Sequence, residues 1–190
     1  KRRDPATLNA ENPALALLEA VMDRQIALST EGMRVGFMHG VMNTDNVALS
    51  GETIDYGPCA FMDSYHPETV FSSIDQRGRY AYGNQPVITQ WNLARFAETL
   101  IPLIDDDADR AVETAEALIK SHTERYAQSW LAMMRRKLGL FGDDEGDAGL
   151  AADLLDWMGR HDADHTNTFR DLIGGAVPDG ALYQDQGFLD

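Results

Sequence analysis

An amide and two carboxylates lie close together in the stretch HGVMNTDNVALSGETIDYG, residues 39–57. Asn46 offers an amide oxygen and Asp55 a carboxylate, and both are hard ligands of the kind that Mg²⁺ prefers. Mg²⁺ commonly takes only one or two protein oxygens and completes its octahedron with water and nucleotide phosphate. The pair therefore predicts a site for Mg²⁺, or for Mn²⁺, bound together with a nucleotide.

A third side chain in this stretch suggests an acid–base role. Phosphotransferases of the kinase type use an Asn from a catalytic loop and an Asp from an Asp-aromatic-Gly triplet, with a catalytic Asp five positions before the Asn. That position is Val41 here, and a valine cannot accept a proton. Asp45 is the nearest carboxylate and becomes the candidate catalytic residue. Two alternatives stay open. In the first, Asp45 is only a turn acid that hydrogen-bonds its own backbone. In the second, the Asp-Asn and Asp-Tyr-Gly strings are unrelated, and each is an ordinary capped turn.

Short local elements are expected to position these residues. Two extended runs, 47–49 and 53–55, flank Ser50-Gly51-Glu52, and such a turn signal predicts a β-hairpin that brings Asn46 and Asp55 together. Before it, the Asn12-Pro13 pair predicts the start of a helix that reaches about Glu31. After it, residues 57–84 form a loop whose five aromatic side chains argue for order.

The chain after Pro86 is predicted to be helical. Apolar stripes indicate one helix through Ile104 and a long helix that ends near Leu138, and these stripes are typical of a core. His122 falls on the apolar side of the long helix and is interpreted as a core histidine. Two further helices follow, the second capped by Asp164 or Thr166. The expected fold class is mainly α with a small β-hairpin, in a single domain over residues 1–190.

Composition limits the classes of partner. The 190 residues carry 31 acidic and 16 basic side chains, a formal net charge of −15. Such a surface repels phosphate backbones and anionic lipid headgroups, so neither nucleic acid nor a membrane is an expected partner. No apolar run approaches the roughly 18 residues that a spanning helix needs. The single cysteine, Cys59, fits a reducing compartment, and a cytoplasmic location is expected if the source is bacterial.

Three longer blocks carry a resemblance to a known family: HGVMNTDN, TIDYGPCAFMDSYHP, and GRYAYGNQP followed by WNLARFAETLIPLI. In these blocks, over residues 39–104, the chain resembles the selenoprotein O (SelO/YdiU) family. The resemblance implies a protein-kinase-like fold and transfer of AMP from ATP to Ser, Thr or Tyr hydroxyls of proteins. It also implies that Asn46 and Asp55 carry the metal, that Asp55 also faces the nucleotide ATP, and that Asp45 accepts a proton. Residues 1–140 would form the kinase-like C-terminal lobe, and residues 141–190 a helical extension.

Other parts of a kinase-like site are not found. Residues 1–38 contain neither a G-x-G-x-x-G loop nor a V-A-I-K-like strand, so the N-terminal lobe is interpreted as absent and the fragment is expected to be inactive. Two rival functions stay open: a small-molecule phosphotransferase, which Val41 disfavours, and a non-catalytic pseudokinase scaffold. Arg79 is open as well, because it could bind a nucleotide phosphate, bind a substrate acid, or only fasten the loop.

Overall fold

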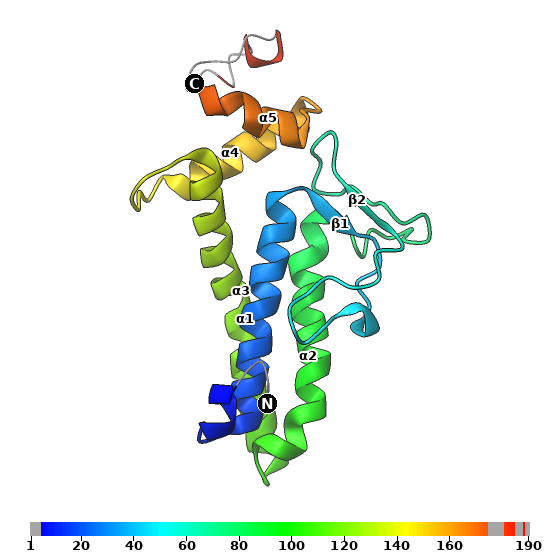
Figure 1. The fold of residues 1–190 in the computed structure, drawn as a ribbon, viewed down its shortest axis with the longest axis vertical. Helices are drawn as coiled ribbons and strands as arrows, with labels where there is room; N and C mark the ends of the chain where they lie inside the picture. Colours follow the sequence, from blue (N-terminus) through cyan, green and yellow to red (C-terminus); the bar gives the residue numbers. More distant parts are fainter. Residues whose placement is uncertain (1–4, 175–180, 185–187, 189–190) are drawn as a thin grey trace.

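The computed structural model describes residues 5–174, 181–184 and 188, and in this part the chain is mainly helical (Figure 1). Five α-helices and one two-stranded antiparallel sheet make up its regular structure, apart from short 3₁₀ turns. In chain order these elements are α1 (Pro13–Arg34), β1 (Phe37–His39), β2 (Cys59–Phe61), α2 (Gln85–Ile104), α3 (Ala108–Leu138), α4 (Asp147–Arg160) and α5 (His165–Asp171). None of the described helices combines the length and the apolar character that a bilayer crossing requires.

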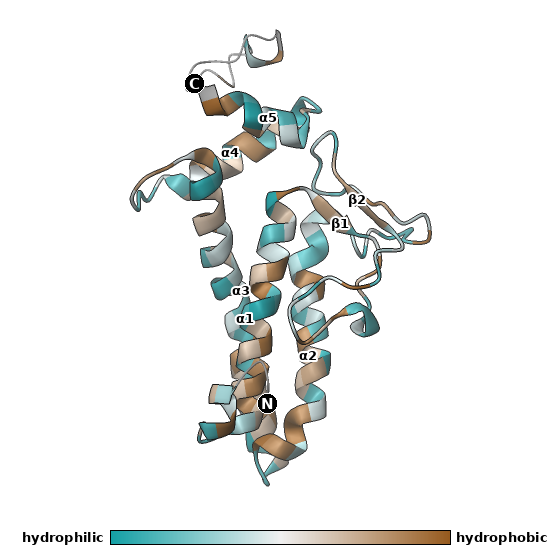
Figure 2. Ribbon diagram, in the orientation of Figure 1, coloured by the Kyte–Doolittle hydropathy of each residue, from teal (hydrophilic) through white to brown (hydrophobic). Residues whose placement is uncertain are grey.

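Helices α1, α2 and α3 run side by side and form a bundle (Figure 1). Their apolar residues, brown in Figure 2, meet in two adjoining clusters of buried side chains. The Asn12 side chain caps α1 by accepting a hydrogen bond from the Leu15 N–H, and its amide donates to the carbonyl of Ile104 at the end of α2. The predicted start of α1 is thus confirmed, and the same residue ties α1 to α2.

A second core lies where α4, α5, the sheet and the 57–84 loop meet the ends of α1 and α3. Trp157 of α4 and Met133 of α3 are almost fully buried in it. The loop is fastened to the start of α5, because the Tyr65 N–H donates to the Ala163 carbonyl and the His165 N–H donates to the Asp63 carbonyl. This core draws on residues from both sides of position 140, near which the resemblance implied the change from lobe to helical extension.

The predicted hairpin is wrong in its extent. Its two runs share only an isolated antiparallel bridge, Val47 with Thr53. Between the bridged residues the chain turns, because the Gly51 N–H donates to the Ala48 carbonyl at 3.0 Å. The Ala48 and Leu49 carbonyls also accept hydrogen bonds from α1 side chains, Gln25 at 2.7 Å and Arg24 at 2.9 Å. The sheet instead pairs β1 with β2, Phe37 opposite Phe61 and His39 opposite Cys59.

Candidate functional site

His39 stands at the centre of the candidate site and joins its two halves. The ring is buried at the end of β1. The Val41 N–H donates to Nδ1 at 3.4 Å, so the proton lies on Nε2, which donates to the Ile54 carbonyl at 2.8 Å. One imidazole therefore links the loop that carries Asp45 and Asn46 to the segment that carries Asp55.

Gln85, the first residue of α2, fixes the strand that presents His39. Its Oε1 accepts a hydrogen bond from the His39 N–H at 3.0 Å, and its Nε2 donates to the Phe37 carbonyl at 2.9 Å. The side chain is itself buried, so both bonds lie away from water, where a lost partner would be costly. The bundle thereby sets the position of the sheet edge on which the site is built.

The 40–46 loop is held by contacts that use its backbone. A Cβ at Gly40 would lie 2.6 Å from the Pro58 carbonyl oxygen, so only glycine fits there. Nδ2 of Asn46 donates to the Val41 carbonyl at 2.9 Å, which closes the loop and leaves the amide oxygen of Asn46 available as a ligand. Asn92 of α2 donates to the Met42 carbonyl, also at 2.9 Å. Val41 thus acts through its peptide group and not through its side chain.

Asp55 has an unusual backbone conformation. Its φ of +53° places it in the left-handed region, which non-glycine residues rarely adopt and which tends to mark functional sites. It lies two residues after Thr53, and the Val47–Thr53 bridge puts Asn46 and Asp55 at the same end of the short ribbon. Asp45 is in the 3₁₀ turn Thr44–Asn46, and both carboxylates are exposed. The bridge and the His39 hydrogen bonds therefore bring together the two segments that carry Asp45, Asn46 and Asp55.

The donor set is compatible with a divalent ion that is shared with a ligand. Among residues 5–174, 181–184 and 188, no group of three or more His, Cys, Asp or Glu side chains could hold a metal alone. The Asn46 amide and the Asp55 carboxylate supply two hard oxygens, which is the number that Mg²⁺ commonly takes from protein. The remaining positions would have to be filled by water or phosphate oxygens.

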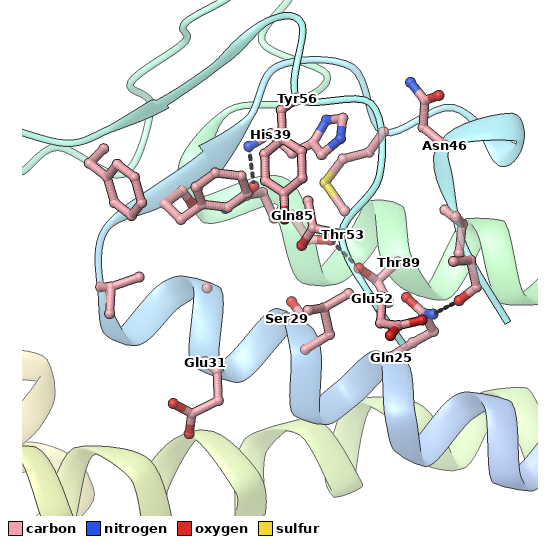
Figure 3. A pocket seen from close by; sticks show the side chains of 18 residues that line it. Gln25, Ser29, Glu31, His39, Asn46, Glu52, Thr53, Tyr56, Gln85 and Thr89 are labelled. Atoms are coloured by element: carbon pink, nitrogen blue, oxygen red, sulfur yellow. Dashed lines mark hydrogen bonds between the residues drawn. The ribbon is translucent and has the colours of Figure 1, made fainter. Parts of the chain in front are cut away.

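A cavity of about 270 Å³ opens next to these residues (Figure 3). Gln25 and Ser29 of α1 lie on one side of it, Gln85 and Thr89 of α2 on another, and Asn46 is at its rim. Much of the remaining lining is apolar or aromatic and comes from Leu28, Val35, Phe37, Met42, Val47, Tyr56 and Phe61. Neither Asp45 nor Asp55 lines this cavity. A flat apolar group would fit there, with polar atoms turned toward the Asn46 rim.

Sequence reasoning did not assign roles to His39 and Gln85. The His-Gly pair in the opening stretch was the available signal for His39, because a histidine before the catalytic loop is part of the kinase motif. Gln85 gives no such signal, since its partners lie 46 and 48 residues away along the chain. Its role depends on how α2 packs beside β1.

Comparisons with known proteins agree with one another. Residues 5–184 match the family model described as "Protein adenylyltransferase SelO". Three similar relatives carry the name "Protein nucleotidyltransferase YdiU": those of Alcanivorax borkumensis (63% identical over 98% of this chain), Nitrosococcus oceani (57% over 99%) and Geobacillus kaustophilus (55% over 100%). The matched region covers 39%, 38% and 39% of these relatives, so the chain spans less than two fifths of their length.

Proposed function

The chain belongs to the SelO family of protein adenylyltransferases, and from this premise we propose that it forms the metal-binding and proton-accepting part of such an enzyme. Its fold would be the C-terminal lobe of a kinase-like protein, with the last helices as an extension. The reaction would move AMP from ATP to a Ser, Thr or Tyr hydroxyl of another protein. The His39 bridge between the two motif segments is the observation that best supports this function.

The chemistry assigns a separate task to each of three residues. Asn46 and Asp55 would hold Mg²⁺, which when bound neutralises charge on the phosphates of ATP. Asp45 would accept the proton of the attacking hydroxyl, whose oxygen bonds to the α-phosphorus while the bond to pyrophosphate breaks. Positioning and charge stabilisation supply much of the rate in such transfers, so the missing acid at Val41 is tolerable.

The isolated chain is expected to bind nucleotide weakly and to transfer nothing. The parts of a kinase-like site that cradle phosphates, a glycine-rich loop and a strand lysine, are not found in residues 1–38. Transfer therefore has to be tested in a full-length relative that carries the residues equivalent to Asp45, Asn46 and Asp55.

Metal binding can be tested on the chain itself, with Mn²⁺ as the probe and electron paramagnetic resonance as the readout. We expect Asp55→Asn to weaken Mn²⁺ binding by about tenfold or more, because it removes a direct carboxylate ligand. Asp45→Asn should leave Mn²⁺ binding within about twofold but abolish transfer in the full-length relative. Asp153 is an exposed acid on α4, and Asp153→Asn is the matched control. It should change neither the Mn²⁺ affinity nor the transfer of AMP.

Two results would count against the proposal. Unchanged Mn²⁺ affinity in Asp55→Asn would remove the metal site. Mass spectrometry of the substrate protein separates an added AMP from an added phosphate, and an added phosphate would mean ordinary kinase chemistry instead of adenylylation.

A further inference from the structure

Two arginines next to the candidate site have no acidic partner among the residues that the structure describes. Most other described arginines of this acidic chain form ion pairs, as Arg110 does with Asp105 at 2.7 Å and Arg125 with Glu19 at 2.6 Å. Arg77 and Arg79 are exposed, and within the described part of the chain neither guanidinium has a carboxylate partner. In a protein with 31 acids and 16 bases, unpaired arginines leave a local positive charge free for a ligand.

Arg79 is held by aromatic rings instead. Its guanidinium lies over the Trp91 ring, 4.7 Å from the centroid, and over the Tyr80 ring, 5.7 Å from the centroid. Arg95 also lies over Trp91, at 5.3 Å, but it pairs with Glu98. We call Arg79, Tyr80, Trp91 and Arg95 the arginine platform. Stacking fixes the plane of the Arg79 guanidinium and leaves its N–H groups free for a carboxylate.

The turn before the platform fixes the backbone of Arg79 and does not pair its guanidinium with a carboxylate. The two carboxylate oxygens of Asp75 accept hydrogen bonds from the backbone N–H groups of Arg79, at 2.8 Å, and Tyr80, at 2.7 Å. The Asn84 amide donates to the Arg79 carbonyl at 3.2 Å. These bonds fix the backbone of the turn, so less conformational freedom is lost when the side chain binds a ligand.

The platform borders the loop that carries Asp45. The Tyr80 hydroxyl donates to Oδ1 of Asn43 at 2.5 Å, two residues before Asp45. Asn92, the neighbour of Trp91 on α2, donates to the Met42 carbonyl. A polypeptide with its hydroxyl at Asp45 would place its next residues, about 3.3 Å apart when extended, within reach of the platform.

We propose that Arg79 recognises the carboxylate of an Asp or Glu that flanks the hydroxyl to be modified in the protein substrate. This inference rests on the proposed function and names its substrate class. A protein carboxylate fits better than a nucleotide phosphate, because the platform bonds Asn43 through Tyr80, whereas Asn46 and Asp55, the proposed metal ligands, lie at the end of the Val47–Thr53 ribbon. Repulsion from the net charge of −15 is screened beyond about 8 Å in physiological salt, so local contact decides the binding.

The test compares two fluorescein-labelled peptides by fluorescence anisotropy on the 190-residue chain, without ATP or metal. One peptide has a central Ser flanked by Glu residues, and the other has Gln at those positions. We expect the Glu peptide to bind about two- to fivefold more tightly, the range typical of an exposed charge pair. Arg79→Gln should remove this preference, and Arg79→Lys should retain part of it, because lysine keeps the charge but not the planar fork.

Arg110→Gln is the matched control, since Arg110 lies at the start of α3, at the far end of the bundle from the site (Figure 1). The proposal fails if the two peptides bind equally, or if Arg79→Gln and Arg110→Gln have the same effect. It also fails if Arg79→Gln weakens binding of Mg-ATP and leaves the peptide preference intact, because Arg79 would then be a nucleotide ligand. A peptide preference that persists in Asp55→Asn, while that variant binds Mn²⁺ more weakly, separates this inference from the proposed function.

Discussion

At the scale of single residues, the backbone of Asp55 is the strongest local sign of function. Of the described residues, only Asp55 and Asp162 adopt a positive φ without being glycine. Asp162 follows the end of α4, where a left-handed residue is an ordinary way to terminate a helix. Asp55 terminates no helix, so its strain is best explained by the need for a carboxylate at that point.

Replacing either strained aspartate by glycine separates strain from function. We expect Asp55→Gly and Asp162→Gly each to raise the free energy of unfolding by about 0.5–1 kcal/mol, because glycine adopts this conformation without a Cβ clash. Only Asp55→Gly should abolish Mn²⁺ binding. Urea unfolding and electron paramagnetic resonance measure the two effects, and a loss of stability in Asp55→Gly would contradict the strain argument.

The sequence was sufficient to predict the candidate metal ligands, but not the residues that hold the site in position. Asn46 and Asp55 could be proposed because an amide and a carboxylate at that spacing suit a hard cation. Their roles remain predictions, while the structure places both at one end of the same ribbon. Gln85, which holds the strand bearing His39, could not be found from local pattern, because its hydrogen bonds depend on how distant elements pack.

At the scale of elements, features that depend on neighbouring residues in the sequence, such as helix caps, were predictable. Features that depend on contacts between distant elements were not. Asn12 caps α1, Gly139 ends α3 in the left-handed conformation, and Asp164 caps α5, each as its residue type favours. The hairpin prediction was wrong in extent because the residues after Val47 form a turn, closed by the Gly51 N–H and the Ala48 carbonyl, and are held by Arg24 and Gln25 of α1. The contacts with α1 could not be predicted from residues 47–55 alone.

His122 on α3 makes the bundle sensitive to acid. It is buried against Tyr126, and its Nε2 has no hydrogen-bond partner among the described residues. Burial lowers the pKa of His122 from 6.5 to about 4. Between these values the unfolded chain binds more protons than the folded one, so stability falls as the pH drops from 6.5 toward 4. Burial likewise lowers the pKa of His165 to about 4, so two side chains contribute.

His122→Leu should therefore remove about half of the acid sensitivity. We expect the wild-type chain to lose about 2 kcal/mol per buried histidine between pH 7 and pH 4, and the variant to lose only the His165 share. Urea midpoints at pH 7, 5.5 and 4.5 measure the slope. The control is His66→Leu, an exposed histidine, which should leave the slope unchanged. A wild-type slope in His122→Leu would mean that other groups govern the acid response.

At the scale of the whole molecule, an ion-pair joint between α3 and α4 is one of the connections between the bundle and the second core. Arg135, in the last turn of α3, bonds Asp147 at 2.6 Å and Asp143 at 2.6 Å. Asp147 is buried in the first turn of α4. A cation at the end of one helix and an anion at the start of the next also suit both helix dipoles. The candidate site lies away from this joint, between α1, α2 and the sheet.

Arg135→Gln should therefore destabilise the second core, around α4 and α5, and leave the core of the helix bundle nearly unchanged. The substitution leaves the buried Asp147 carboxylate without its cation, which we expect to lower the free energy of unfolding by about 2 kcal/mol. Hydrogen exchange should quicken in α4 and α5 far more than in α1 and α2, and Mn²⁺ affinity should be unchanged. Arg160→Gln, which breaks an exposed pair with Asp156, should change stability by less than about 0.5 kcal/mol. An equal increase of the hydrogen-exchange rate in every helix would contradict this prediction. It would show that the two cores unfold as one cooperative unit.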